Sequence, residues 1–210
     1  MKIGIFFYNV TKAQSHKFFR DLFNKLKTLA HNDLKNTIES LWLGVFVAKK
    51  KTDMKYSRLT KEQFEELHQE FINFLSTQAI DKAEWDKIKI EKPAVAEQEL
   101  DVFSDLVWEG VLGRAQYLEH FSKNHIFLFQ CFDTYVQSIV LKSLVPETDF
   151  LTKEGLQWLS DNMFTETIEI KTGKKAFTEE RNSSIFELIQ QGSFLSDGQL
   201  FKQIISIIES

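Results

Sequence analysis

The sequence predicts an α+β fold, in which helices flank a small antiparallel β-meander and a short βαβ-like N-terminal extension precedes them. Two observations predict it. Apolar residues recur at helical spacing over residues 60–77, 94–112 and 178–191, and aromatic and β-branched residues concentrate over residues 117–143. Helices on both sides of a run of strands are typical of the α+β class.

Charge divides the chain into two parts. Residues 1–53 contain ten basic and four acidic residues, 10 − 4 = +6, whereas residues 54–210 contain 16 basic and 26 acidic residues, 16 − 26 = −10. A difference of this size indicates two parts with different roles. We therefore expect a basic N-terminal extension over residues 1–53 and a single acidic α+β domain over residues 54–210.

The basic extension has the pattern of a small βαβ fragment. Residues 2–10 and 41–48 are short apolar runs typical of buried strands, and residues 15–30 place Phe and Leu on one face of a basic helix. The first strand is not followed by the glycines that a phosphate-binding loop needs. The amphipathic helix predicts either packing against the rest of the protein or contact with a membrane surface. A further interpretation is that residues 1–53 lie upstream of a true start at Met54, and the sequence leaves these alternatives open.

The acidic part begins with helices. Thr60 and Gln63 form a capping box, and the helix that it opens is expected to reach about Thr77. Asp81 is the expected N-cap of a second, shorter helix.

A long third helix follows at once. Pro93 ends the preceding helix and suits the first turn of this one, which extends over residues 94–112 with Gly113 just beyond its C-terminus. Its expected buried side consists of Val95, Leu100, Val102, Phe103, Leu106, Val107 and Val111.

The middle of the acidic part predicts strands. Residues 117–121 and 125–130 form a hairpin around Ser122-Lys123-Asn124, and residues 135–143 form a third strand. A short strand is expected over residues 167–171, with Gly173 in the turn after it.

Helices return in the last third of the chain. Thr152 begins one, a second extends over residues 178–191 and ends at Gly192, and the last covers residues 197–208.

Four stretches of the acidic part are similar to a known family, namely MKYSRLTKEQFEELHQEFINFLSTQAIDKAEWDKIK, ELDVFSDLVWEGVL, YLEHFSKNHIFLF and LTKEGLQWL. Through them the chain resembles a family of short bacterial proteins of unknown function, over nearly all of residues 54–210. The resemblance implies a cytosolic bacterial protein of one domain whose chain starts at the position of Met54. It implies no activity, cofactor or catalytic residue.

The candidate surface combines an aromatic side chain with charged and titratable ones. It consists of Trp108, Glu109, Arg114, His120, Lys123 and His125. Two histidines flanking a hairpin turn beside a carboxylate are able to form a metal site or an acid–base pair. Their separation of five residues matches no helical ligand pair, and we favour histidines that shape the hairpin.

Carboxylates recur at helical spacing on two helices, as Glu62, Glu66 and Glu70 and as Asp101, Asp105 and Glu109. Two facing acidic stripes would suit a two-metal hydrolase. Burying so many carboxylates without a metal is costly, so we favour solvated, outward-facing stripes.

Several kinds of chemistry are disfavoured. The single cysteine, Cys131, lies in an apolar strand where a thiol is inert, and no G-x-S-x-G motif is present. A net charge of −10 repels nucleic acid. We expect no cofactor, no metal and no catalytic residue, and the longest apolar run, Leu41–Ala48, is too short to span a membrane.

These observations favour a cytoplasmic, non-catalytic protein that acts through a protein partner or as a homodimer. One alternative is a metal-dependent hydrolase that uses the acidic stripes or the hairpin histidines. The other is a peripheral membrane adaptor that uses the basic helix over residues 15–30, which requires residues 1–53 to be present.

Overall fold

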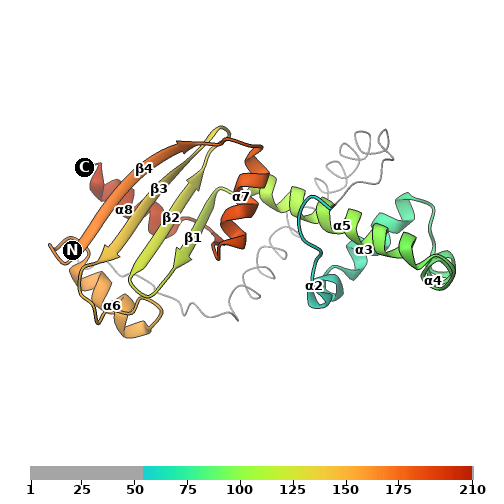
Figure 1. Cartoon of the computed structure of the whole chain (residues 1–210), viewed down its shortest axis with the longest axis horizontal. Helices are drawn as coiled ribbons and strands as arrows, with labels where there is room; N and C mark the ends of the chain where they lie inside the picture. The colour runs from blue at the N-terminus through green and yellow to red at the C-terminus, as the bar shows by residue number, and fades with distance from the viewer. Residues whose placement is uncertain (1–53, 210) are drawn as a thin grey trace. The chain divides into compact units, whose positions relative to one another are not determined.

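The structure is a computed structural model, and it describes residues 54–209 (Figure 1). The strands predicted over residues 2–10 and 41–48 and the helix predicted over 15–30 lie outside the described residues. The described residues belong to two compact units, residues 54–113 and 114–209, here called the helical unit and the sheet unit. Together their elements confirm the α+β prediction. No helix within residues 54–209 has both the length and the apolarity needed to cross a bilayer.

The helical unit begins with helices whose N-termini are capped as predicted. Its elements are α2 (Lys61–Glu66), α3 (His68–Thr77), α4 (Lys82–Glu91) and α5 (Pro93–Arg114). Thr60 and Gln63 exchange side chain-to-backbone hydrogen bonds, which confirms the capping box. The carboxylate of Asp81 accepts a hydrogen bond from the backbone N–H of Glu84 at 2.8 Å, which confirms the second cap.

The helix predicted from Thr60 to Thr77 is interrupted at Leu67, so a single continuous helix was wrong. Leu67 has φ −103° and ψ 16°, outside the helical values, and its side chain is buried. Its N–H still bonds to the carbonyl of Gln63, and its carbonyl accepts from the N–H of Phe71. Because both bonds survive, the apolar spacing continues across the break, and the sequence pattern does not reveal it.

An aromatic cluster forms the core of the helical unit. The ring of Phe103 on α5 lies 5.1 Å from that of Phe71 and 5.4 Å from that of Phe74, between ring centroids. Phe64 and Trp85 extend the cluster, at 5.9 Å from Phe103 and 5.4 Å from Phe71 respectively. Aromatic pairs at these separations stabilise a core by about 0.5–1.5 kcal/mol each beyond their area burial.

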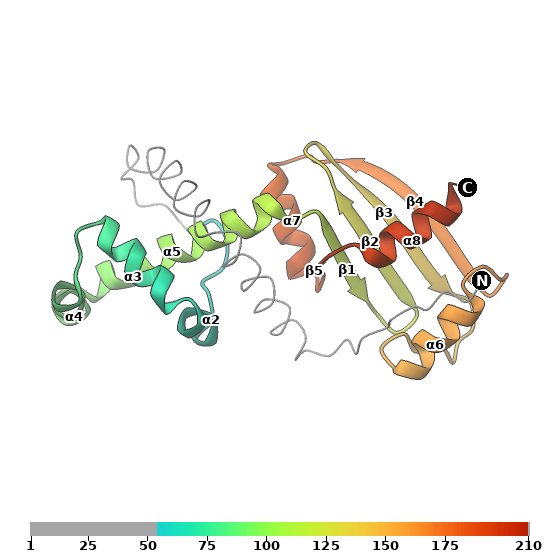
Figure 2. The ribbon, with the colours of Figure 1, turned by 180° about the vertical axis from the view of Figure 1, so that it is seen from behind.

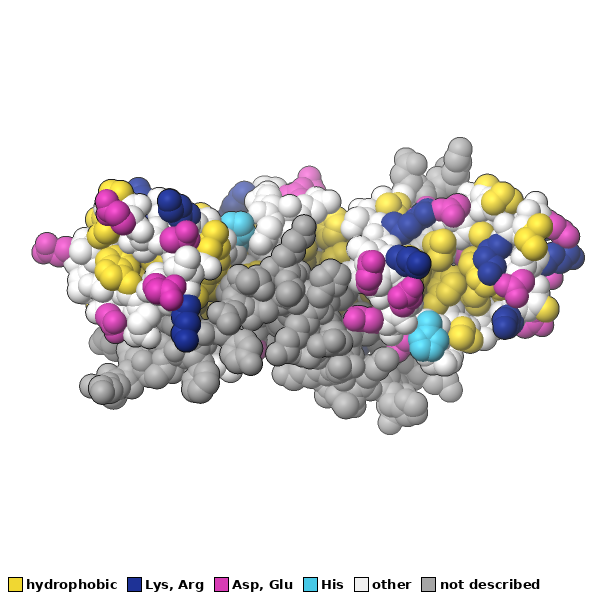
Figure 3. Space-filling model, turned by 90° about the horizontal axis from the view of Figure 1, so that it is seen from below, with side chains coloured by type: hydrophobic (Ala, Val, Ile, Leu, Met, Phe, Trp, Pro, Cys, Tyr) yellow, Lys and Arg dark blue, Asp and Glu magenta, His cyan; other side chains and the backbone are white. Residues whose placement is uncertain are grey.

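The long helix α5 differs from its prediction at one end and along its buried side. Pro93 is its first residue, as expected, but the helix continues through Gly113 to Arg114, so Gly113 is not a residue beyond the helix end. Val102 is 40% exposed, whereas Ser104 and Trp108 are buried. The N-terminal segment of the unit packs on the side of α5 that carries Ser104 and Trp108, a contact that helical spacing does not encode. Figure 3 shows hydrophobic side chains between acidic and basic ones at the surface of the helical unit.

The sheet unit contains an antiparallel sheet with the strand order β4-β3-β2-β1-β5. Its strands are β1 (Tyr117–Phe121), β2 (His125–Cys131), β3 (Tyr135–Ser143), β4 (Ile168–Ala176) and β5 (Phe194–Ser196). The predicted hairpin and third strand are confirmed, with His120 opposite Phe127 and Leu128 opposite Ile139.

The edges of the sheet depart from the prediction. β4 continues through Gly173, which pairs with Ser138, so a turn at Gly173 was wrong. The strand continues because β3 supplies partners as far as Tyr135, which lies opposite Ala176. The other edge strand, β5, was not predicted, since three residues are too few for an alternating pattern.

Helices α6 (Lys153–Asn162) and α8 (Gln199–Ile208) cover one face of the sheet, here called the back face (Figure 2). A helix was expected to begin at Thr152, and the structure confirms it: the hydroxyl of Thr152 caps α6 by accepting a hydrogen bond from the N–H of Gly155. The buried residues of this core are Tyr117, Ile126, Leu128, Ile139, Leu141, Phe150, Leu156, Leu159, Met163, Ile168, Phe201 and Ile204.

The opposite face, seen in Figure 1, is here called the front face. Helix α7 (Arg181–Gln190) lies at its β1 end and is followed by Gly192, whose φ of +99° confirms the expected glycine after this helix. A Cβ atom at Gly192 would lie 3.1 Å from the ring of His120, which places the end of α7 beside β1. The guanidinium of Arg181 donates to the carbonyls of Phe132 and Ala115 and so ties α7 to the ends of β1 and β2.

Candidate functional site

Three residues of the candidate surface lie on α5. Trp108 is 7% exposed, and its indole N–H donates a hydrogen bond to the carbonyl of Ser57 at 2.9 Å, so it belongs to the core of the helical unit. Glu109 lies one residue further along. Arg114 ends the helix and is exposed.

The carboxylates of Asp105 and Glu109 contact the segment that precedes α2. Asp105 accepts hydrogen bonds from the backbone N–H groups of Lys55 at 2.8 Å and of Tyr56 at 2.9 Å. Glu109 accepts a hydrogen bond from the hydroxyl of Tyr56, and its carboxylate lies 3.3 Å from the ammonium of Lys55. These acidic side chains therefore act as acceptors for a segment of the same unit.

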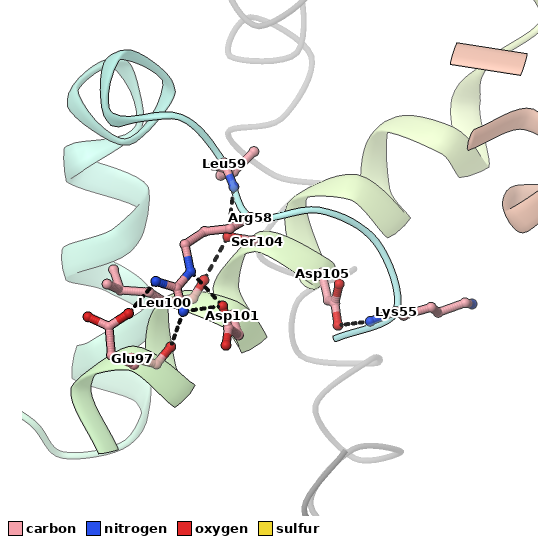
Figure 4. Close-up of polar contacts among 8 residues, drawn as sticks. All are labelled: Lys55, Arg58, Leu59, Glu97, Leu100, Asp101, Ser104 and Asp105. Atoms are coloured by element: carbon pink, nitrogen blue, oxygen red, sulfur yellow. Dashed lines mark hydrogen bonds and ion pairs between the residues drawn. The ribbon is translucent and has the colours of Figure 1, made fainter. Parts of the chain in front are cut away.

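Arg58, in the same segment before α2, contacts acidic side chains that lie nearer the start of α5 (Figure 4). Its guanidinium pairs with the carboxylate of Glu97 and, at 2.6 Å, with that of Asp101. The backbone N–H of Leu59 donates to the hydroxyl of Ser104 at 3.2 Å, which gives that buried hydroxyl a partner. The predicted acidic stripe on α5 thus faces residues 55–59.

The other predicted stripe lies on α2 and α3. Glu62 and Glu66 are exposed and Glu70 is half-buried, and the break at Leu67 separates the first two from the third. Within residues 54–209, no three His, Cys, Asp or Glu side chains are grouped so that they could hold a metal ion.

The two hairpin histidines lie on the same face of the sheet. His120 is directly opposite Phe127, and His125 is two residues from Phe127 on the same strand, so all three side chains point to the front face. The ring of Phe127 lies 5.6 Å from that of His120 and 5.8 Å from that of His125, between centroids. The sequence interpretation found the pair but not the phenylalanine between them.

The turn of this hairpin is held by backbone contacts. The carbonyl of Lys123 accepts a hydrogen bond from the N–H of Phe150 at 2.7 Å, and the carbonyl of Asn124 accepts from Ser143 at 3.0 Å. The ring Nδ1 of His125 lies 2.8 Å from the side-chain oxygen of Asn124, a hydrogen-bonding distance. The turn therefore fixes where His125 lies at the end of the front face.

The register defines the front face as four rows of side chains. The rows are His125, Lys142 and Glu169; His120, Phe127, Val140 and Lys171; Leu195, Leu118, Phe129, Ser138 and Gly173; and Cys131, Val136 and Lys175. Over β2 and β3 the rows contain half-buried apolar residues, and over β4 they contain exposed lysines. Helices α6 and α8 cover the back face, and no helix of the described residues lies over β2, β3 and β4 on the front face (Figure 1).

Charged groups gather at one corner of the front face. The ammonium of Lys171 lies 2.9 Å from the carboxylate of Glu169. The hydrogen bond from Lys171 holds the pKa of Glu169 below its usual value, and the charges of Lys171, Lys142 and His125 add to this effect. The lysines outnumber the carboxylate here, so this corner is positive although residues 114–210 carry more acidic than basic side chains.

Sequence reasoning missed the front-face residues Phe127, Phe129, Val140, Lys142 and Lys171. A signal for the apolar ones was present, because apolar residues on both faces of β2 and β3 mark strands that contact something on each side. Lys142 and Lys171 gave no such signal, because only the pairing of β3 with β4 places them beside the apolar residues of β2 and β3.

A family model, the Family of unknown function (DUF6495), matches residues 54–209, and the chain belongs to this family. No curated protein and no solved structure matches the chain.

Proposed function

We propose that this protein is a cytoplasmic, non-catalytic protein-interaction domain and that the front face of the sheet unit is its contact surface. One observation carries the proposal. The face opposite α6 and α8 has an apolar centre of Phe127, Phe129 and Val140 and a border of lysines on β4.

This pattern is unusual for a solvated sheet face. Antiparallel sheets commonly place apolar residues on the covered face and polar residues on the other. Contiguous apolar side chains rimmed by polar ones are typical of protein–protein contact sites. An aromatic centre with a charged border is also the usual anatomy of an interface.

The test compares two variants as baits for chemical cross-linking in cells that make the protein. Val140→Glu places a charge at the centre of the front face, and Ile72→Glu places one at a 50% exposed apolar residue of the helical unit. We expect the wild type and Ile72→Glu to cross-link to the same partner through front-face residues, and Val140→Glu to lose it. Equal cross-linking by all three proteins would refute the proposal.

A second copy of the chain is the other occupant that this experiment distinguishes. Sedimentation velocity of the wild type and Val140→Glu shows whether the cross-linked species is a homodimer. If the wild type is a dimer and Val140→Glu is a monomer, the front face is still the contact surface, but its partner is a second copy of the chain.

A further inference from the structure

We infer that the partner supplies an extended acidic segment that pairs with β4 as an additional strand of the sheet. This inference rests on the proposed interaction role, because it names the partner's chemistry at the border of the front face.

The outer edge of β4 carries backbone groups that are directed away from the sheet. The N–H of Leu144 bonds to the carbonyl of Thr167, and the N–H of Phe177 bonds to that of Thr134. In an antiparallel ladder hydrogen-bonded pairs alternate, so the residues of β4 bonded to β3 are the odd-numbered ones. The N–H and C=O groups of Ile170, Thr172 and Lys174 therefore point outward.

This edge is long and accessible. β4 has nine residues, its last six are exposed, and within residues 54–209 it pairs with β3 only. An edge of this kind is a template for strand addition, in which main-chain hydrogen bonds supply affinity and side chains supply specificity.

The side chains of the edge select for negative charge. Residues 114–210 contain nine basic and 13 acidic residues, 9 − 13 = −4, yet Lys171, Lys174 and Lys175 lie together on β4. Lys171 and Lys175 point to the front face, and Lys174 points to the back, where its ammonium lies 5.9 Å from the ring centroid of Tyr135. An added strand would have lysines beside both of its faces, so acidic side chains on it would be complementary to the edge.

A second copy fits this edge poorly. Antiparallel pairing of β4 with β4 of another molecule would bring three lysines and one carboxylate, Glu169, from each molecule to one seam, and this excess of positive charge disfavours the pairing. Lysines on an edge strand also guard against self-association. If the lysines served only to prevent self-association, β4 would bind no acidic strand. The experiment below distinguishes this outcome from the one that we expect.

The probe is a fluorescein-labelled peptide of alternating Glu and Val with the length of β4, compared with the matching peptide of alternating Lys and Val. Binding to the full chain is measured by fluorescence anisotropy at low and at high salt. We expect the acidic peptide alone to bind and its affinity to fall as salt is added. Equal binding of both peptides, or no binding of the acidic one, would overturn the inference.

Two substitutions at one position separate strand addition from plain charge attraction. Thr172 is exposed and its N–H points outward, so Thr172→Pro removes an edge donor without breaking the ladder to β3. Thr172→Val retains that donor. We expect Thr172→Pro to weaken binding about tenfold, which corresponds to about 1.4 kcal/mol for the one lost hydrogen bond, and Thr172→Val to bind like the wild type. Equal affinities for the two variants would contradict pairing at β4.

Amide hydrogen exchange of the wild type tests the same contact without any substitution. With the acidic peptide bound, we expect slower exchange at Thr172 and Lys174 and little change at Lys171 and Gly173, whose N–H groups already face β3. Unchanged exchange at Thr172 and Lys174 would overturn the inference even if Thr172→Pro does not fold. If Val140→Glu loses the cross-linked partner but the acidic peptide does not bind the wild type, strand addition is refuted and the proposed function still stands.

Discussion

The hydroxyl of Tyr56 donates a hydrogen bond to the carboxylate of Glu109. This bond joins the segment before α2 to the long helix α5, and the ring of Tyr56 is 7% exposed. Burial raises the pKa of Tyr56 well above its usual value, and the hydrogen bond to Glu109 raises it further. The predicted acidic stripe therefore contributes to the stability of the helical unit.

Removing this hydroxyl is expected to weaken the helical unit. Tyr56→Phe should lower the free energy of unfolding by about 1 kcal/mol, because a buried hydrogen bond is lost and the ring is retained. Urea denaturation at pH 7 measures the change. An unchanged midpoint would show that Glu109 is equally well solvated without its partner.

The same residue predicts an alkaline dependence. A tyrosine whose folded pKa is raised contributes stability that is complete below its unfolded pKa of about 10 and is lost as the pH rises through the folded value. The wild type should therefore lose more stability between pH 9 and pH 11 than Tyr56→Phe. Parallel curves for the two proteins would contradict the raised pKa.

The two aspartates of the α5 stripe are expected to differ. Asp105→Ala removes the acceptor of two backbone N–H groups and should cost about 1–3 kcal/mol, since hydrogen bonds to a charged group are strong. Asp101→Ala removes an exposed ion pair with Arg58 and should cost less than about 1 kcal/mol. Urea midpoints of the two variants give the comparison, and equal losses would argue against a special role for Asp105.

Two helical glycines are expected to respond in opposite directions to alanine. A Cβ atom at Gly155 would lie 1.8 Å from the backbone oxygen of Asp149, so Gly155→Ala should destabilise the sheet unit by about 3 kcal/mol. Among the described residues, a Cβ at Gly110 meets no atom within 4 Å, so Gly110→Ala should stabilise α5 by about 0.5–1 kcal/mol. Thermal unfolding measures both, and a stable Gly155→Ala would require the loop at Asp149 to move.

Glu119 predicts an acid-to-neutral dependence of stability. Burial raises its pKa, a hydrogen bond from Ser196 opposes this, and the charge of Asp197 raises it further. A carboxyl group with a raised folded pKa loses stability as the pH rises from its unfolded pKa of about 4.3 through the folded value. Glu119→Gln should therefore become more stable relative to the wild type between pH 4 and pH 7. A constant difference between their denaturation midpoints would contradict this.

Cys131 is expected to react slowly in the folded protein. Burial raises the pKa of its thiol to about 11, although the nearby charge of Arg181 opposes the rise. Iodoacetamide at pH 8 should label the unfolded chain rapidly and the native chain far more slowly, because the thiolate is the reactive form. Mass spectrometry at fixed times measures the two rates, and equal rates would show that the thiol is accessible and ionised.

Local signals in the sequence were sufficient wherever a structure depends on neighbours along the chain. The caps at Thr60 and Asp81 and the helix starts at Thr152 and Pro93 each involve groups within a few residues, and all were predicted. The hairpin around Ser122–Asn124 was predicted for the same reason.

The candidate site could be predicted only in part. The sequence identified His120 and His125 at the ends of two strands, but whether they share a face depends on the register of the hairpin. Val140 and Lys171 join them through pairings with β3 and β4, and alternation within one strand carries no information about its neighbours.

By itself, the sequence determined the α+β class, the starts of α2, α4, α5 and α6 and the central strands, because periodicity and capping are properties of short segments. Four sequence stretches also identified the family. Only the tertiary structure decided that β4 passes Gly173, that β5 pairs with β1, and that the acidic side chains of α5 face residues 55–59. Each of these contacts joins residues far apart in the chain. Their free energy comes from a partner surface that exists only after folding.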